Sequence, residues 1–159
     1  MIFIGLGSNE GNPAKNLRQA LDLLPKHEIK LIRCSAFYRT EPWGITEQNV
    51  FVNAVAELAY EGEAIELLDA LLAIEQEMGR IRHFKWGPRL IDLDVLEFHR
   101  QEIDTERLQL PHPYYPERDF VLVPMAELEP DWVPTGLEMS LSEKIAELEI
   151  PDMPIWEED

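Results

Sequence analysis

Four stretches of the chain carry the pattern of β-strands, in which successive side chains point to opposite faces of a sheet. They cover residues 2–7, 28–39, 51–60 and 90–98. In the third stretch the even-numbered positions from 52 to 58 are all apolar and would share one face, whereas Phe51 and Asn53 begin the other. The pattern therefore predicts strands that bury one face at least.

Two helices are predicted between these strands. Asn12 followed by Pro13 is typical of a helix start, which places the first helix from there to about residue 24. The second helix covers residues 64–78 and stops at Gly79, a common helix-ending residue. Its apolar stripe is expected to consist of Ile65, Leu68, Leu71, Leu72 and Met78.

Beyond residue 100 the pattern is weaker. We expect a loop over residues 111–116, short helices around 123–128 and 140–148, and an acidic tail after them. The order strand, helix, strand, strand, helix, strand matches the ferredoxin-like βαββαβ motif. The sequence thus predicts an α+β fold with an antiparallel sheet flanked by helices. No repeat or linker interrupts the chain, so residues 1–159 are expected to form one domain.

The composition is that of an ordinary folded protein, with 45% hydrophobic and 28% charged residues. Cys34 is the only cysteine, which excludes an intramolecular disulfide and a cysteine-based metal cluster and fits a reducing compartment. No apolar stretch approaches the roughly 18 residues that a membrane helix needs. We therefore expect a cytoplasmic protein without a targeting segment.

The net charge of −17, from 31 acidic and 14 basic residues, argues against partners that a negative field repels. Neither nucleic acid nor an anionic membrane is expected to bind. A nucleotide would be repelled as well unless basic residues were gathered in one place. Residues 80–89 gather four of the 14 bases: Arg80, Arg82, Lys85 and Arg89.

Asp92 and Asp94 give the sharpest chemical signal. Residues two apart on a strand face the same way with Cα atoms roughly 6.5–7 Å apart, so both carboxylates would project together while Leu93 faces the core. Such a pair can hold the hard cations used in phosphoryl transfer. Taken alone, the pair fits a solvated acidic strand face equally well. The basic segment 80–89 directly before it favours a site that holds a metal-bound polyphosphate from both sides.

A second group of residues is aromatic and polar. Phe51 and Asn53 share a strand face, and a ring beside an amide suits a flat heterocycle that is both stacked and hydrogen-bonded. By themselves, an ordinary core phenylalanine and a hydrogen-bonded asparagine explain this pair more simply. His112, in a Pro-His-Pro segment, could donate a proton or contact phosphate, although a lone loop histidine usually does neither.

The glycines near the start of the chain do not form a nucleotide-binding loop. Gly5 and Gly7 are followed by Gly11, one residue too late for the dinucleotide fingerprint. The sequence also contains no Gly-x-x-x-x-Gly-Lys-Ser/Thr loop. Any ATP would therefore be held by side chains and metal.

Several segments together resemble the 6-hydroxymethyl-7,8-dihydropterin pyrophosphokinase family, in that family's order and spacing from residue 5 to about residue 130. The run Trp-Gly-Pro-Arg-Leu-Ile-Asp-Leu-Asp over residues 86–94 is the most specific. The other matching segments are 7–9, 37–42, 51–53, 79–82, 111–113 and 118–124. The resemblance implies an ATP-dependent, Mg²⁺-requiring enzyme that transfers diphosphate to the hydroxymethyl group of the pterin and leaves AMP, a step of folate synthesis.

The resemblance also implies roles for individual residues. Asp92 and Asp94 would bind two Mg²⁺ ions, and Arg82 and Arg89 would act with them in catalysis. The pterin contacts would be Thr40, Pro42, Trp43, Phe51, Asn53 and Phe120, with the two phenylalanine rings on opposite faces of the pterin. The nucleotide contacts would be Glu75, Arg82, Lys85, Trp86, Arg89, His112 and Arg118. Lys85 stands where the family usually has Arg, which loses a two-bond grip on phosphate.

The main alternative is a binding module of the same fold that holds nucleotide or pterin without turnover. Retention of both aspartates, both arginines and the aromatic pair argues against it. An RNA-binding ferredoxin-like domain conflicts with the negative charge and lacks the exposed aromatic sheet signature. The expected partners are therefore small molecules, ATP and the pterin, and the chain is expected to act as a monomer.

Overall fold

The computed structural model describes residues 1–40, 50–79 and 90–156. Its main sheet consists of β1 (Ile2–Ser8), β2 (Lys30–Cys34), β3 (Tyr38–Thr40), β4 (Phe51–Ala59) and β5 (Asp92–Phe98). The strand order is β2-β4-β1-β5, β3 pairs with β4 beyond the end of β2, and every pair is antiparallel. This arrangement confirms the predicted α+β fold with a ferredoxin-like core.

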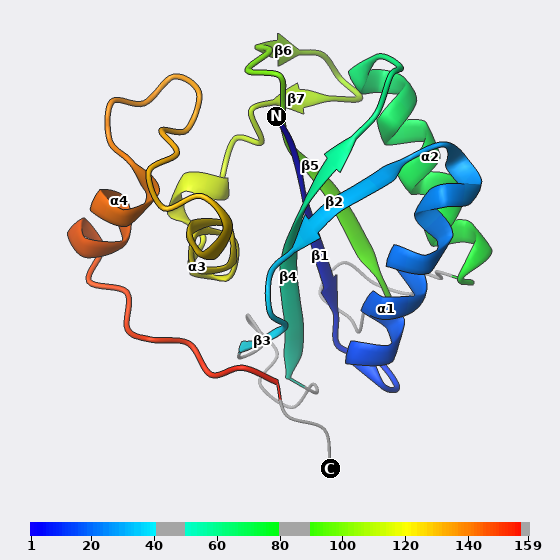
Figure 1. Cartoon of the computed structure of the whole chain (residues 1–159), viewed down its shortest axis with the longest axis horizontal. Coiled ribbons are helices and arrows are strands. Elements are labelled where there is room, and N and C mark those ends of the chain that lie inside the picture. Colours follow the sequence, from blue (N-terminus) through cyan, green and yellow to red (C-terminus); the bar gives the residue numbers. More distant parts are fainter. Residues whose placement is uncertain (41–49, 80–89, 157–159) are drawn as a thin grey trace.

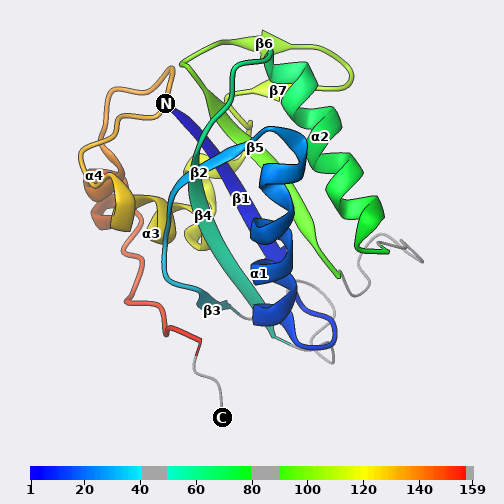
Figure 2. The ribbon, with the colours of Figure 1, turned by 45° about the vertical axis from the view of Figure 1, so that its right-hand side comes forward.

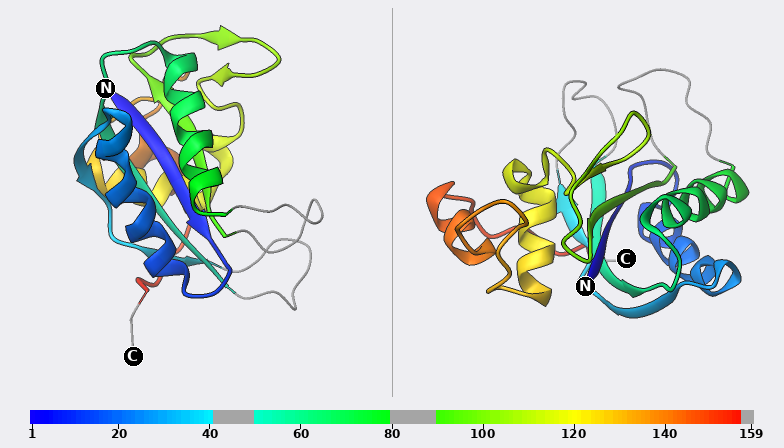
Figure 3. Two further views of the ribbon diagram at one scale, coloured as in Figure 1. Left: turned by 90° about the vertical axis from the view of Figure 1, so that its right-hand side faces the viewer. Right: turned by 90° about the horizontal axis from the view of Figure 1, so that it is seen from above.

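Helices cover both faces of the sheet (Figures 1 and 3). They are α1 (Pro13–Leu23), α2 (Ala64–Glu77), α3 (Asp119–Leu128) and α4 (Leu141–Glu147), with short 3-10 turns η1 (Leu24–His27) and η2 (Tyr115–Glu117). The first two helices lie on one face, and the last two lie on the other. A small hairpin of β6 (Ile103–Asp104) and β7 (Gln109–Leu110) lies beside β5.

Two apolar clusters join the sheet to its helices. Ile4 and Leu6 of β1 belong to the cluster under α1 and α2, whereas Phe3 belongs to the cluster with α3 and α4. The even-numbered residues 52–58 of β4 lie in the first cluster, and Val55 lies in the second, which confirms the predicted alternation. Each fully buried large aliphatic side chain contributes about 1.5–3 kcal/mol, so both faces stabilise the sheet.

The predicted strand over residues 28–39 is wrong in one respect, because it is two strands. At Ser35 a side-chain oxygen replaces a backbone carbonyl as the hydrogen-bond acceptor. Its Oγ accepts from Val55 N (3.0 Å), while Ser35 N donates to Val55 O (2.9 Å). The next amide, Ala36 N, donates to the carboxylate of Glu127 on α3 (3.1 and 3.2 Å). Partners far away in the sequence therefore separate β2 from β3, and the second strand ends at Thr40, one residue beyond the predicted bound.

The predicted stripe of α2 is also partly wrong. Leu67, Leu71 and Ile74 are fully buried, whereas Ile65 and Leu72 are 37% and 38% exposed. The helix carries apolar residues around most of its circumference, so more than one stripe fits the helical period of about 3.6 residues. Leu71 of the predicted stripe is nevertheless fully buried, and Leu68 and Met78 pack against the same cluster, so the prediction fails only at Ile65 and Leu72.

α3 begins at Asp119, four residues before the predicted start. Pro124 lies inside the helix, although proline is more common in the first turn of a helix. The earlier start places Phe120 in the first turn of α3. The helix over Leu141–Glu147 agrees with the prediction and begins at Ser140, whose Oγ accepts from Glu143 N (3.2 Å). Within the described ranges, no helix is both long and apolar enough to cross a membrane.

Candidate active site

Two rows of residues cross three strands of the sheet on the face that α3 covers. The pairing register places each row across β4, β1 and β5, as Figure 2 shows for the three strands. Adjacent strands are about 4.8 Å apart, so the Cα atoms at the two ends of a row are roughly 10 Å apart. The rows are Asn53–Gly7–Asp92 and Val55–Gly5–Asp94.

Gly5 and Gly7 leave the central strand without side chains at these two positions. Their neighbours Ile4 and Leu6 point into the cluster under α1 and α2, so the glycines lie on the other face of the sheet, the one that α3 covers. The two positions of β1 between Asn53 and the carboxylates therefore carry no side chain of their own.

The amide of Asn53 is fixed in one orientation. Its Nδ2 donates to Oγ1 of Thr40 on β3 at 2.7 Å, and Asn53 is 8% exposed. A Cβ atom added at Gly7 would lie 2.7 Å from Asn53 Oδ1, closer than real Cβ contacts allow. The side chain thus leans over Gly7, and the space that the glycine leaves is needed to hold the amide there.

Asp92 and Asp94 lie on the same face of the sheet, as predicted. Ile91, Leu93 and Val95 are buried in the cluster under α1 and α2, so the two acids between them point the other way. Asp92 is half-buried and Asp94 is exposed. Among the described residues there is no group of three or more His, Cys, Asp or Glu that could hold a metal.

Glu75 supports the strand that carries these acids. It is only 4% exposed, and its Oε2 accepts a hydrogen bond from Leu93 N at 2.9 Å. Leu93 lies between Asp92 and Asp94, so the contact fixes the backbone from which both carboxylates project. This position, under the sheet on α2, suits a residue that holds the strand in place.

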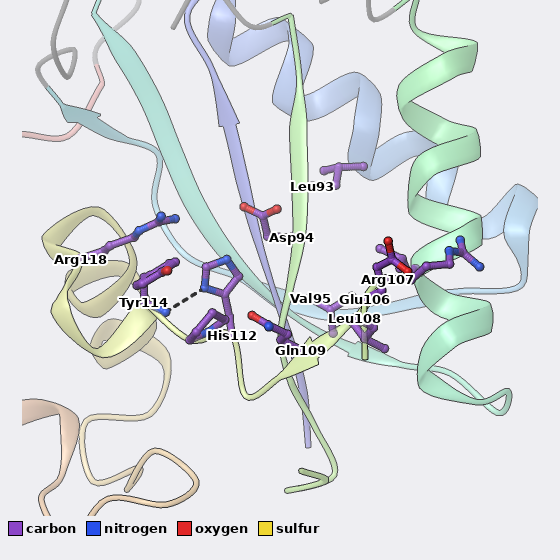
Figure 4. A pocket seen from close by; sticks show the side chains of 12 residues that line it. Leu93, Asp94, Val95, Glu106, Arg107, Leu108, Gln109, His112, Tyr114 and Arg118 are labelled. Atoms are coloured by element: carbon purple, nitrogen blue, oxygen red, sulfur yellow. Dashed lines mark hydrogen bonds between the residues drawn. The ribbon is translucent and has the colours of Figure 1, made fainter. Parts of the chain in front are cut away.

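A pocket of about 440 Å³ opens at the edge of β5 beside Asp94 (Figure 4). The close-up shows the Asp94 carboxylate directed toward the side of the strand where His112 lies, with Tyr114 and Arg118 farther along that side. The residues that line the pocket are Leu68, Leu93, Asp94, Val95, Glu106, Arg107, Leu108, Gln109, His112, Pro113, Tyr114 and Arg118. An exposed ion pair between Arg107 and Asp69 of α2 joins the hairpin loop to that helix.

His112 is neutral at physiological pH. Burial, with the nearby charge of Arg118, lowers its pKa from 6.5 to about 4. Its backbone N donates to Leu96 O (2.9 Å), and its ring Nδ1 accepts from Tyr114 N (3.3 Å). Because Nδ1 is the acceptor, the ring proton resides on Nε2, which is a neutral hydrogen-bond donor.

Arg118 lies between two aromatic rings at the start of α3. Its guanidinium carbon is 5.5 Å from the centroid of the Tyr114 ring and 5.6 Å from that of Phe120. Such contacts favour a cation and restrict its position. Phe120 packs against the cluster under α3, so a positive charge and a partly exposed ring lie together on the face that carries Asn53.

The structure therefore brings many of the predicted site residues onto one face. From β3 and β4 come Thr40, Phe51 and Asn53, from β5 come Asp92 and Asp94, and from α3 and the segment before it come His112, Arg118 and Phe120. Glu75 lies on α2, on the other side of the sheet. The remaining predicted residues, Pro42, Trp43, Arg82, Lys85, Trp86 and Arg89, lie outside the described residues.

Comparison with known proteins identifies a family for this chain. The family model described as 7,8-dihydro-6-hydroxymethylpterin-pyrophosphokinase matches residues 3–130. The chain belongs to this family. The match contains every predicted site residue, from Thr40 to Phe120.

Curated relatives extend the match. A 2-amino-4-hydroxy-6-hydroxymethyldihydropteridine pyrophosphokinase of Methylorubrum extorquens is 45% identical over 84% of this chain and 85% of its own length. Proteins of the same name from Pseudomonas aeruginosa and Bacillus subtilis are each 44% identical, over 82% and 80% of this chain and 81% and 77% of their own lengths. The resemblance stated from the sequence is thereby confirmed.

Three features of this pyrophosphokinase-family site are missed by the sequence reasoning. The sequence reasoning dismisses Gly5 and Gly7 as an incomplete nucleotide-binding loop, yet Gly7 leaves the space that the Asn53 side chain occupies. The signal that identifies them is a Gly-x-Gly pair inside a strand whose alternate residues are apolar. Tyr114, which stacks beside Arg118, carries no comparable signal, and neither does Glu127, whose partners lie on β3 and just before it.

Proposed function

We propose that the chain transfers a diphosphate group from ATP to the hydroxymethyl group of 6-hydroxymethyl-7,8-dihydropterin and releases AMP, as a step of folate synthesis. The observation that carries the proposal is the row Asn53–Gly7–Asp92. At one end of this row is an amide that can hydrogen-bond a pterin, and at the other end is a carboxylate that can bind a metal. Family membership supports the reaction class, in which ATP is the co-substrate.

The pterin is assigned to the β4 side of the row. Asn53 has one Nδ2 hydrogen bonded to Thr40, which leaves a second N–H and the Oδ1 acceptor for the edge of a heterocycle that itself donates and accepts. We assign Phe51, half-buried on the same strand face, and Phe120 of α3 to the two faces of the ring. Pro42 and Trp43 are proposed as further contacts from the family resemblance.

The triphosphate is assigned to the β5 side, next to the pocket of Figure 4. Arg118 supplies a positive charge, and neutral His112 donates from Nε2 without repelling that charge. Glu75 holds the strand backbone between the two aspartates. Arg82, Lys85, Trp86 and Arg89 are proposed as the remaining nucleotide contacts, with Arg82 and Arg89 stabilising negative charge on the departing AMP.

The donor set at Asp92 and Asp94 fits Mg²⁺. Carboxylate oxygens are hard ligands, and Mg²⁺ in phosphoryl-transfer sites is commonly held by one or two carboxylates with substrate phosphates and water. We propose that these aspartates hold two Mg²⁺ ions. When bound, such ions neutralise phosphate charge and acidify the attacking hydroxyl, so no strong protein base is required.

The wider setting is also a proposal. We propose that residues 1–159 act as one domain and as a cytoplasmic monomer. The single cysteine, whose thiol is partly buried, and the net charge of −17 support this setting.

The test is a nucleotide assay on the full chain with ATP, Mg²⁺ and 6-hydroxymethyl-7,8-dihydropterin. The expected result is AMP in proportion to pterin consumed, with no AMP when the pterin is omitted. Asp94→Asn, which keeps the shape of the side chain, is the matched inactive control. Saturable binding of both ligands without AMP would instead indicate a binding module of the same fold.

A further inference from the structure

The last described residues of the chain form an extra strand contact at the edge of the sheet. Arg39 N of β3 donates to Pro154 O (2.8 Å), and Trp156 N donates to Phe37 O (2.7 Å). Between these bonds Ile155 and Tyr38 form an antiparallel bridge. Figures 1 and 2 both show the end of the described chain reaching β3 after passing beneath α3 and α4.

This contact completes a strand that is otherwise short and one-sided. β3 has three residues and pairs with β4 along one edge only. The other edge is covered by residues 154–156, and the Trp156 ring packs with Phe37 against the cluster under α1 and α2. Two main-chain hydrogen bonds are a large share of what can hold a strand of three residues.

β3 in turn holds the amide of Asn53. Thr40, the last residue of β3, accepts the 2.7 Å hydrogen bond from Asn53 Nδ2, and Tyr38 stands opposite Asn53 in the ladder. Glu127 of α3 holds β3 from the helix side, through hydrogen bonds from the Tyr38 hydroxyl and from Ala36 N. A continuous set of contacts therefore runs from Trp156 through β3 to the group assigned to the pterin.

We propose that residues 154–156 are a positioning segment for the pterin side of the site: by adding a strand to β3 they fix Thr40 and thereby the orientation of Asn53. Trp156 is its key residue, because its backbone N–H makes one of the two bonds and its ring anchors the segment. The segment lies beyond the family match, which ends at residue 130. The inference rests on the proposed function, since it assumes that Asn53 binds the pterin.

The test compares three substitutions at Trp156 in the full chain. Trp156→Pro removes the N–H that bonds Phe37 O and also removes the indole ring, and Trp156→Ala removes the ring but keeps the N–H. Trp156→Phe keeps both an aromatic ring and the N–H; it loses only the indole Nε1, which is buried without a partner in the described part of the chain. Asp152→Pro is the matched proline control, because the Asp152 N–H makes no hydrogen bond within the described structure.

The measurements are the affinities for 6-hydroxymethyl-7,8-dihydropterin and for a non-hydrolysable ATP analogue by calorimetry, the KM for each substrate and the melting temperature. We expect Trp156→Pro to weaken pterin affinity about fivefold or more, as the loss of one net hydrogen bond implies, and to raise the pterin KM by a similar factor. Trp156→Ala should have a smaller effect, and Trp156→Phe and Asp152→Pro should resemble the wild type. Nucleotide affinity should stay within about twofold throughout.

The outcomes separate this inference from the proposed function. If the wild-type protein binds no pterin, both fail. If the wild type binds pterin and makes AMP but Trp156→Pro, still folded, binds pterin equally well, the positioning role alone is wrong. Equal losses of pterin and nucleotide affinity would also overturn it, because they would indicate a general loss of structure.

Discussion

Substitution of Gly7 by alanine should damage the pterin side of the site, although glycine carries no functional group of its own. A Cβ at this position would lie 2.7 Å from Asn53 Oδ1. The amide must therefore move by several tenths of an ångström, and it cannot do so without lengthening its 2.7 Å bond to Thr40. Neither Gly7 nor Gly5 has a positive φ, so backbone strain does not enter the comparison.

The magnitude follows from the contacts that are lost. Weakening the bond to Thr40 costs about 1 kcal/mol, and misplacing a hydrogen bond to the ligand costs about as much again. The sum of about 2 kcal/mol corresponds to a roughly 30-fold rise in the pterin Kd. Gly5→Ala is the matched control on the same strand face, because its Cβ would meet Leu96 at 3.7 Å, an ordinary contact. It should change the pterin Kd by no more than about twofold.

Calorimetric titration of both variants with 6-hydroxymethyl-7,8-dihydropterin and with an ATP analogue decides the matter. Gly7→Ala should lose pterin affinity and keep nucleotide affinity, with a melting temperature near that of the wild type. The reasoning is refuted if Gly7→Ala binds pterin as the wild type does, or if Gly5→Ala is equally impaired.

Three further predictions concern other parts of the molecule. Asp92→Asn and Asp94→Asn should each lower kcat about a thousandfold at saturating Mg²⁺ while the fold is kept; a variant with near-normal kcat would contradict the metal assignment. His112 has a folded pKa of about 4, below its unfolded value of 6.5, so its contribution to stability is present above pH 6.5 and is lost as the pH falls toward 4. The free energy of unfolding, measured in urea, should therefore fall less between pH 6.5 and pH 4 in His112→Asn than in the wild type, by about 2 kcal/mol. If the pH dependence is the same in both proteins, His112 is not a buried neutral ring. Burial and the charge of Glu127 raise the pKa of the Cys34 thiol to about 11, so alkylation at pH 8 should be about a hundredfold slower than in urea-unfolded protein; equal rates would show an accessible thiol.

The parts of the fold that depend on local pattern could be predicted from the sequence. β1, β4 and β5 alternate plainly, and Asn12 and Ser140 accept capping hydrogen bonds as their positions suggest. The parts that depend on distant partners could not be predicted. The break between β2 and β3 arises from Val55 and Glu127, and the stripe of α2 that is buried was decided by packing on the sheet.

The candidate site divides in the same way. Asp92 and Asp94 were found because two residues on one strand must share a face whatever the rest of the chain does. The role of Gly7 became visible only when the register set it between Asn53 and Asp92. The contribution of residues 154–156 requires knowing that the chain returns to β3 more than 100 residues later, and no local pattern carries that information.

The central claim is that the β- and γ-phosphoryl groups move together to the pterin. ATP labelled at the β-phosphorus, incubated with the full chain, Mg²⁺ and 6-hydroxymethyl-7,8-dihydropterin, tests it directly. The label should leave the nucleotide and appear in the pterin product, with unlabelled AMP formed in equal amount. Label that stays in ADP while the pterin gains a single phosphate would contradict it.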